Sequence, residues 1–381
     1  MTKLVGLTWD HPRAIDGLRA ITASYLRDRP GLEIEWIVRS LRKFESASIE
    51  EVSRSYDMVV LDHPCVGEAA ASGCLVDFQR HAGRLDLDGL KADTVGRSFD
   101  SYVYRGCMWA LPIDATTQFS AYRVGALADD ELPADIDGVL ALGRRSGIAL
   151  ALKGIHSLMT FWSLCAVHGD PVGRETDDRL VSRKAASAAF ETLRELYALC
   201  PPQAIGWDPI DVHETLAHAD GPDYCPYLYG YVPYARADAA GPLRFGNAPG
   251  RKRGVALAGT IIGGTGLAIS SSCKAIDEAV AFAGAVTSRN VQLAMGLAGG
   301  QPARRSAWGD ATLNRRFSDF YRGALPTMES GIVRPRYSGY IQFQERAGAI
   351  AEACVAGRTA IADAVDALEA AHRDMSKGRT A

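Results

Sequence analysis

The sequence predicts an α/β fold that begins with a parallel sheet. Strand-like and helix-like segments alternate three times within the first 80 residues. The continuous apolar run Asp57–His63 is typical of a strand covered on both faces. The alternation restarts after Pro112, and an apolar strand returns late, at Leu267. These observations predict two α/β lobes with right-handed crossovers between parallel strands.

The first elements follow from apolar periodicity and from one capping motif. Apolar residues at period two predict strands, and apolar residues three or four apart predict helices. Ser48 is a predicted helix N-cap, because Glu51 three residues later completes a capping box. In order, we expect strand 4–8, helix 15–26, strand 33–38, a helix opened by Ser48, strand 57–63 and helix 66–78.

The rest of the chain is read in the same way, and it sets the expected domain boundaries. Lobe one is expected to comprise residues 1–111 and 266–312, and lobe two residues 112–265 and 313–381. The expected elements are strand 113–123, a loop over 132–137, helices 138–146, 157–167 and 190–200, a loop-rich region 219–253, a strand within 259–272, helix 276–283, and helices 341–355 and 359–375 separated by Gly357.

Composition argues against several kinds of partner. The 42 Lys and Arg residues nearly balance 45 Asp and Glu residues, so the net charge of -3 creates no field that attracts nucleic acid. No apolar run approaches the roughly 18 residues of a membrane-spanning helix. The first residues lack the apolar core of a signal peptide. The chain as written is therefore expected in the cytoplasm, or in the periplasm or outside the cell if it is a mature form.

Motifs for metals, nucleotides and catalysis are missing from the sequence. His213 and His218 are five residues apart, which does not place them on one helix face, and there is no H-E-x-x-H motif. The glycines of 263–266 precede a strand-like segment, so close passage of neighbouring backbones explains them better than phosphate binding. No G-x-S-x-G motif occurs. We therefore expect no metal, no cofactor and no catalytic residue.

The eight cysteines are expected to be reduced and structural. They form no C-x-x-C pair and are too sparse for a disulfide scaffold. They are Cys65, Cys74, Cys107, Cys165, Cys200, Cys225, Cys273 and Cys354.

Two acid–imidazole pairs are candidate ligand contacts. Asp10 and His11 follow the first expected strand, and Asp62 and His63 end the third. Ligands of open parallel sheets bind beyond the carboxyl ends of the strands. Ordinary loop polarity is the alternative explanation.

The densest unusual feature is the segment 224–234, which holds five tyrosines in eleven residues. A tyrosine ring offers a flat apolar face and a hydrogen-bonding edge, which suits a sugar ring or a nitrogenous metabolite. The alternative is a loop in which these rings only pack against each other.

Four segments together resemble a known family. They are DMVVLDHPCVGEAAASGCLVDF (57–78), SYVYRGCMWALPIDATTQFSAYR (101–123), GTIIGGTGLAISSSCKAIDEAVAFAGAVTSRNVQLAM (259–295) and QPARRSAW (301–308). In this order they resemble the extracellular solute-binding proteins of ABC importers, specifically the carbohydrate-type family that includes maltose- and glycerol-phosphate-binding proteins.

The resemblance implies a periplasmic-binding-protein-like fold of two lobes, with the ligand in a cleft between them and 111–115 as the first crossing segment. Matching positions, together with the acid–imidazole pairs, give the candidate ligand-binding residues Trp9, Asp10, His11, Asp62, His63, Thr116, Tyr229, Tyr231, Gly264, Thr265, Arg304 and Tyr337.

The leading hypothesis is a non-catalytic protein that closes on a small polar solute, such as a sugar or polyol, and serves an ABC importer. Its expected partners are that small molecule and the permease subunits. The alternative is a cytoplasmic enzyme or ligand sensor that has kept the binding fold. The missing signal peptide favours the alternative, and the absence of a catalytic motif opposes it.

Overall fold

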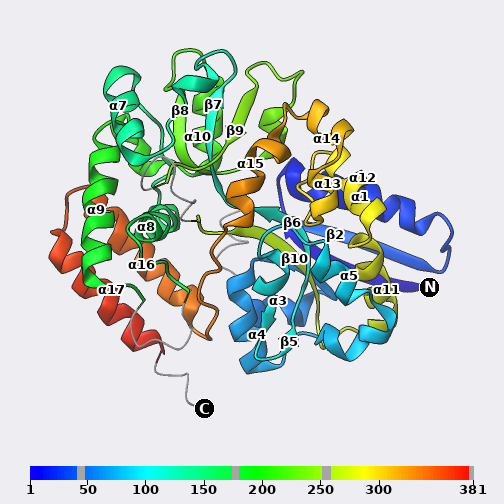
Figure 1. Ribbon diagram of the computed structural model, residues 1–381. Coiled ribbons are helices and arrows are strands. Elements are labelled where there is room, and N and C mark those ends of the chain that lie inside the picture. Colours follow the sequence, from blue (N-terminus) through cyan, green and yellow to red (C-terminus); the bar gives the residue numbers. More distant parts are fainter. Residues whose placement is uncertain (41–47, 174–179, 251–258, 377–381) are drawn as a thin grey trace. The chain divides into compact units, whose positions relative to one another are not determined.

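A computed structural model describes residues 1–40, 48–173, 180–250 and 259–376, shown in Figure 1. The described chain divides into two compact units, and each unit contains segments that are distant in sequence. Unit 1 comprises Met1–Thr116, Gly263–Leu313 and Arg336–Ile341, and unit 2 comprises Thr117–Ile262, Asn314–Pro335 and Gln342–Ala381.

Unit 1 is built on a five-stranded sheet with the order β2-β1-β3-β10-β6. Strand β1 pairs in parallel with both β2 and β3, as the alternating sequence predicts. Strand β10 is antiparallel to β3 and β6, because it starts at the sheet edge at which β6 ends. The parallel strands predicted for the first 80 residues therefore belong to a mixed sheet. The strands are β1 Thr2–Trp9, β2 Leu32–Arg39, β3 Met58–Leu61, β6 Leu111–Thr116 and β10 Gly263–Ile269.

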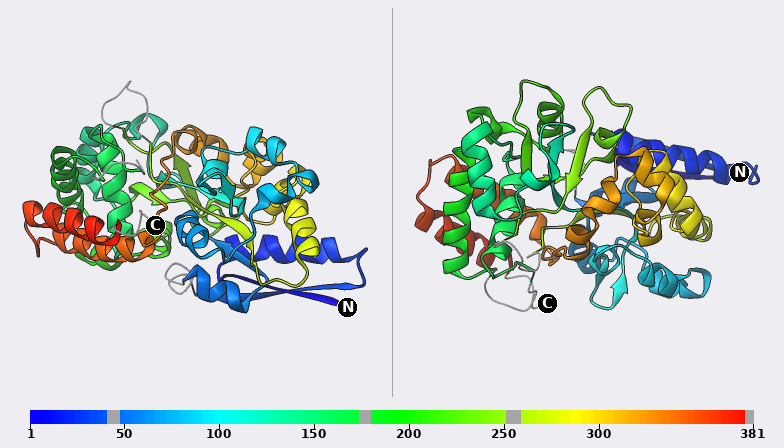
Figure 2. Two further views of the ribbon diagram at one scale, coloured as in Figure 1. Left: turned by 90° about the horizontal axis from the view of Figure 1, so that it is seen from below. Right: turned by 45° about the horizontal axis from the view of Figure 1, so that its top comes forward.

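Both faces of this sheet are covered, because each strand sends apolar side chains to opposite sides. On one face Leu4, Val60 and Leu267 pack with Leu18 of α1 and Phe282 of α11. On the other face the sheet packs against α3 and α4. Figure 2 shows α1 lying along strands β1 and β2. Unit 1 is therefore a three-layer α/β/α arrangement.

Among the described residues of unit 1, four α-helices lie where the sequence predicts helices, and the five within residues 87–101 and 289–316 were not predicted. Ser48 caps α3, and its hydroxyl oxygen accepts a hydrogen bond from the backbone N–H of Glu51 at 3.5 Å. Helix α4 ends at Ser72 rather than near residue 78, because Gly73 adopts a left-handed conformation with φ of 64°. The α-helices are α1 Pro12–Leu26, α3 Ile49–Ser55, α4 Val66–Ser72, α5 Leu87–Ala92, α6 Ser98–Ser101, α11 Ile276–Val286, α12 Arg289–Leu297, α13 Arg305–Trp308 and α14 Ala311–Arg316, which runs across the unit boundary. Short elements are the 3-10 turns η1 His63–Cys65 and η2 Phe78–Arg84 and the strands β4 Val103–Tyr104 and β5 Cys107–Met108.

The single strand expected over 113–123 is two strands. Strand β6 belongs to the sheet of unit 1, whereas β7 (Gln118–Arg123) belongs to the sheet of unit 2. Thr117 separates them, and its hydroxyl group donates to the carbonyl oxygen of Ile261 at 3.0 Å. No glycine or proline occurs between Ile113 and Arg123, so the sequence does not reveal the break.

Unit 2 contains a three-stranded antiparallel sheet with the order β8-β7-β9, surrounded by helices. The rings of Phe161 in α8 and Phe190 in α9 stack with centroids 4.0 Å apart. Helix α17 packs against α9, as Figure 1 also shows. The remaining elements are α7 Ile136–Ser146, α8 Ile155–Val167, α9 Arg183–Tyr197, α10 Pro209–Ala217, α15 Phe320–Glu329, α16 Tyr340–Val355, α17 Ile361–Ser376, β8 Tyr224–Tyr229, β9 Leu243–Gly246, η3 Asp129–Glu131, η4 Pro202–Gly206 and η5 Val232–Ala235.

One late segment belongs to unit 1 although the sequence places it in lobe two. Within Arg336–Ile341, the Arg336 guanidinium donates to the carbonyl oxygens of Asp100 at 2.7 Å and Val103 at 2.8 Å. Its backbone also lies against Gly67, where a Cβ atom would meet the Arg336 carbonyl oxygen at 1.6 Å. These long-range contacts carry no periodic signal, which is why the sequence does not indicate them.

The structure also describes the state of the cysteine thiols and the character of the helices. All eight cysteines are free. Among the described residues, no helix is long and apolar enough to cross a bilayer.

Candidate functional site

One edge of the unit 1 sheet gathers most of the predicted ligand contacts. Strands β1, β3 and β6 all run toward this edge and end there at Trp9, Leu61 and Thr116, and β10 starts there at Gly263. Polar residues that follow or precede these strand ends are therefore neighbours in space. We call this the carboxyl edge of unit 1.

At the end of β1, the Trp9 side chain is buried and the Asp10 side chain is exposed. Trp9 is 4% exposed and belongs to the core, whereas Asp10 is exposed. His11 caps α1, and its Nδ1 accepts a hydrogen bond from the backbone N–H of Arg13 at 3.1 Å. Burial, assisted by the charge of Arg13, lowers the pKa of His11 to about 4. His11 is therefore a neutral imidazole near pH 7.

At the end of β3, Asp62 caps the turn η1. Its Oδ1 accepts a hydrogen bond from the backbone N–H of His63 at 2.8 Å and lies 3.0 Å from Nδ1 of the same residue. The His63 side chain is fully buried, and its ring meets Tyr102 edge-on. Asp62 is only partly buried. The structure thus gives His63 a packing position and leaves the partly exposed carboxylate of Asp62 at the carboxyl edge.

The glycines of β10 allow two backbones to approach closely, as the sequence predicts. Gly264 has φ of 93°, and a Cβ atom there would meet the carbonyl oxygen of Asp114 at 2.3 Å. Thr265 pairs with Asp114, and Thr116 pairs with Gly263. Both threonine side chains are buried. Gly264, Thr265 and Thr116 therefore lie together at the carboxyl edge.

A buried ion pair that the sequence analysis missed lies beside these residues. Arg13 and Asp114 are 5% and 6% exposed, and Nε of Arg13 donates to Oδ2 of Asp114 at 2.9 Å while its Nη2 pairs with Oδ1. Burial raises the pKa of Asp114, and the Arg13 guanidinium acts in the opposite direction. A carboxylate within the otherwise apolar strand β6 was the available signal, because a buried charge needs a partner.

This ion pair borders a cavity of about 10 Å³, which is near the smallest volume that holds one water molecule. The Thr265 hydroxyl, which also lines the cavity, has no hydrogen-bond partner among the described residues. The lining residues are Trp9, Arg13, Ala14, Leu18, Val60, Ile113, Asp114, Thr265, Met295, Gly300 and Gln301. The cavity is too small for a metabolite.

Tyr337 lies near the same region through its backbone. A Cβ atom on Gly67, five residues after Asp62, would come within 2.6 Å of the Tyr337 carbonyl carbon. The Tyr337 side chain is 4% exposed, and its ring packs edge-on against Tyr340 at 5.5 Å. The candidate residue Tyr337 therefore lies close to the start of α4.

The tyrosine cluster of unit 2 is divided between packing and partial exposure. Tyr224 and Tyr227 are buried in strand β8, and the Tyr231 ring packs 5.2 Å from His213. Tyr229 is partly exposed at the end of β8, where it pairs with Gln118. Tyr224, Tyr227 and Tyr231 are thus buried, and Tyr229 is the partly exposed member at the strand end.

Arg304 lies elsewhere in unit 1. Its side chain is 6% exposed, and the guanidinium donates to the carbonyl oxygens of Thr287 at 2.8 Å and Gly89 at 2.6 Å. It lines a different pocket, between α5 and the start of α12. The structure therefore separates Arg304 from the residues of the carboxyl edge.

The carboxyl edge offers side chains that can form hydrogen bonds to a polar ligand. Asp10 and Asp62 are hydrogen-bond acceptors for hydroxyl or ammonium groups. In the described part of the chain, no group of three or more His, Cys, Asp or Glu side chains is arranged to hold a metal ion.

Solved structures match the chain over its whole length. A ribitol-bound ABC transporter solute-binding protein from Agrobacterium radiobacter K84 is 20% identical, with a TM-score of 0.80 over 98% of both chains. A tagatose-bound solute-binding protein from Thermotoga lettingae TMO is 14% identical, with a TM-score of 0.84 over 98% of this chain and 100% of that one. The chain has the fold of the ABC transporter solute-binding proteins.

The same solute-binding-protein fold is found in UgpB from Mycobacterium tuberculosis in complex with glycerophosphocholine, which is 17% identical and matches with a TM-score of 0.79 over 100% of both chains. These neighbours are binding proteins rather than enzymes. No family model matches the chain, and no curated protein matches its sequence. The resemblance carried by four sequence segments is thus confirmed at the level of the fold.

Proposed function

We propose that the protein binds a small polar solute and that it delivers this solute to an ABC importer. The observation that carries the proposal is the gathering of polar residues at the carboxyl edge of unit 1, in a chain with the solute-binding-protein fold. Open α/β sheets bind ligands at this edge.

The proposed contacts keep most of the residues predicted from the sequence. From unit 1 they are Trp9, Asp10, His11, Asp62, His63, Thr116, Gly264, Thr265 and Tyr337, and from unit 2 they are Tyr229 and Tyr231. Asp62 and Tyr229 are the central pair, because each is partly exposed at the end of a strand. Arg304 is left out, because its guanidinium binds two backbone carbonyl groups in another pocket.

The proposed ligand class is a polyol, sugar or related metabolite. Asp10 and Asp62 supply acceptors for hydroxyl groups, and the Tyr229 ring supplies an apolar face. The structural neighbours bind ribitol, tagatose and glycerophosphocholine. The proposed macromolecular partner is the permease of the importer, and in that role the protein works outside the cytoplasmic membrane.

A thermal-shift screen of the full chain tests the proposal. The library contains pentitols, hexitols, mono- and disaccharides, glycerophosphodiesters, betaines and amino acids. A ligand that binds only the folded state raises the melting temperature in proportion to ln(1 + [L]/Kd). We expect a saturable rise with at least one polyol, sugar or glycerophosphodiester. Saturable shifts confined to the amino acids would contradict the ligand class.

A further inference from the structure

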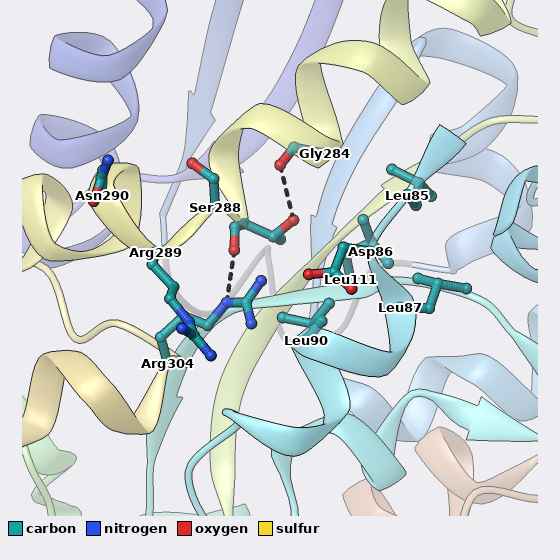
Figure 3. A pocket seen from close by; sticks show the side chains of 11 residues that line it. Leu85, Asp86, Leu87, Leu90, Leu111, Gly284, Ser288, Arg289, Asn290 and Arg304 are labelled. Carbon is teal, nitrogen blue, oxygen red and sulfur yellow. Dashed lines mark hydrogen bonds between the residues drawn. The ribbon is translucent and has the colours of Figure 1, made fainter. Parts of the chain in front are cut away.

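We infer that unit 1 carries a second ligand site, separate from the carboxyl edge, that binds a small organic anion with an apolar body. The site is a pocket of about 460 Å³ between α5, α11 and the start of α12, shown in Figure 3. Pockets of roughly 300 to 1,000 Å³ are typical of small-molecule sites.

One side of the pocket is apolar and the other is polar. Leu85, Leu87, Leu90 and Leu111 form the apolar side, where Asp86 also lines the pocket, and Ser288, Arg289 and Asn290 lie across from them in Figure 3. This division matches a molecule with a hydrocarbon part and one charged group.

Arg304 supplies a buried cation to the pocket. Its side chain is 6% exposed, and Nε and Nη1 are held by the carbonyl oxygens of Thr287 and Gly89. Nη2 has no hydrogen-bond acceptor among the described residues, and Figure 3 shows the guanidinium facing Leu90 and Leu111. Two fixed nitrogens hold the third in place, so Nη2 is a preorganised donor for an anion.

The first turn of α12 adds a second positive feature. Its N-cap, Ser288, makes no side-chain capping hydrogen bond, and the turn contains no acidic residue. The unsatisfied N–H groups at a helix start attract anions. Arg289 lies in the same turn, although its Nε pairs with Asp93 at 2.9 Å.

The acidic residues nearby are already engaged. Asp93 accepts hydrogen bonds from Arg289 and from the backbone N–H and hydroxyl group of Ser306, and its Oδ2 also lies 3.9 Å from Nη1 of Arg304. Asp86 caps α5 through the backbone N–H of Gly89 at 2.9 Å. The Nη2 of Arg304 and the start of α12 are thus left to recognise an external anion.

The pocket is distinct from the carboxyl edge. Leu111 begins β6 and Thr116 ends it, so the two sites are separated along this strand by about 16 Å, at roughly 3.3 Å per residue. Occupancy of one site therefore does not block the other.

The test uses calorimetric titration of the full chain with benzoate and with benzamide, which has a similar shape and no charge. We expect saturable benzoate binding that is at least tenfold tighter than benzamide binding, because a charge-assisted hydrogen bond is lost with the amide. Inorganic phosphate, which lacks an apolar body, should bind more weakly than benzoate. Equal binding of benzoate and benzamide, or no saturable benzoate binding, would overturn the proposal.

Two variants at the N-cap of α12 isolate the role of charge. Aspartate and asparagine are both good N-cap residues, so Ser288→Asp and Ser288→Asn should fold equally well. Ser288→Asp places a negative charge at the pocket and should weaken benzoate binding at least tenfold relative to Ser288→Asn. Asp62→Asn, at the carboxyl edge, should leave benzoate affinity unchanged. If Asp62→Asn changes benzoate affinity tenfold or more in either direction, benzoate occupies the carboxyl edge and the second site is wrong.

Discussion

Arg13 and Asp114 form the most deeply buried ion pair beside the carboxyl edge, and removal of one partner has a calculable effect. Arg13→Met leaves the Asp114 carboxylate buried without its cation, which should lower the free energy of unfolding by about 3 to 5 kcal/mol. Replacing both partners by apolar residues removes that uncompensated charge.

The double variant Arg13→Met/Asp114→Leu should therefore recover most of the lost stability, as measured by urea denaturation with tryptophan fluorescence. If single and double variants are equally destabilised, packing around Arg13 matters more than the charge of its partner.

Asp62 and Tyr229 test the proposed binding site one side chain at a time. Asp62→Asn keeps an N-cap acceptor for η1 and removes only the charge, so affinity for the solute found in the screen should fall roughly 10- to 150-fold with little change in the unliganded melting temperature. Tyr229→Ala should weaken binding at least tenfold, and Tyr229→Phe should retain most of the affinity.

Asp88→Asn is the control for Asp62→Asn, because Asp88 is an exposed carboxylate of α5 in the same unit. A Tyr229→Ala variant that loses melting temperature but keeps its affinity would assign this ring to packing.

At the scale of the elements, strand β10 requires a glycine at position 264. Gly264→Ala should destabilise the protein for two reasons, the positive φ and a Cβ atom placed 2.3 Å from the Asp114 carbonyl oxygen. Gly299 has a similar φ of 98°, but a Cβ atom there would meet no other atom within 4 Å. Gly299→Ala therefore reports the backbone cost alone, about 1 to 2 kcal/mol.

We expect Gly264→Ala to exceed that cost by at least about 1 kcal/mol in denaturant unfolding, because backbone strands must separate to admit the methyl group. Equal losses for the two variants would mean that β10 and β6 move apart freely.

At the scale of the whole molecule, one imidazole in each unit couples stability to pH. Burial lowers the pKa of both His11 and His156 from 6.5 to about 4, with help from Arg13 at His11 and from Lys153 and Arg334 at His156. Between these values the unfolded chain binds protons that the folded chain does not. Stability is therefore complete above pH 6.5 and falls as the pH falls toward 4.

Each imidazole can contribute up to roughly 3 kcal/mol to this loss. The melting temperature, measured calorimetrically from pH 7 to pH 4, should fall less in the double variant His11→Asn/His156→Asn. Asparagine at position 11 retains an N-cap acceptor for α1. An identical fall in the variant would assign the acid sensitivity to carboxylates.

Ligand binding should also change the dimensions of the protein. If the two units close on the solute, small-angle scattering should report a smaller radius of gyration at saturation. A radius that does not change with saturating solute would mean that binding does not require closure.

The sequence by itself determined the local elements and the position of part of the site. Period-two and helical patterns placed β1, α1 and β3, and the parallel pairing of β1 with β3 put Asp10 and Asp62 at one edge. Ser48 marked the start of α3, because capping depends on neighbouring residues. Such features depend on residues that are close together in the chain, so they can be predicted from a single sequence.

Only the tertiary structure decided the features that join distant segments. Arg13 meets Asp114 across 101 positions, and Arg304 reaches carbonyl groups near residues 89 and 287 instead of the carboxyl edge. The antiparallel direction of β10, the break at Thr117 and the return of 336–341 to unit 1 likewise depend on pairing partners far along the chain. Periodicity records whether a residue faces an interior, but it does not record which distant residue it meets there.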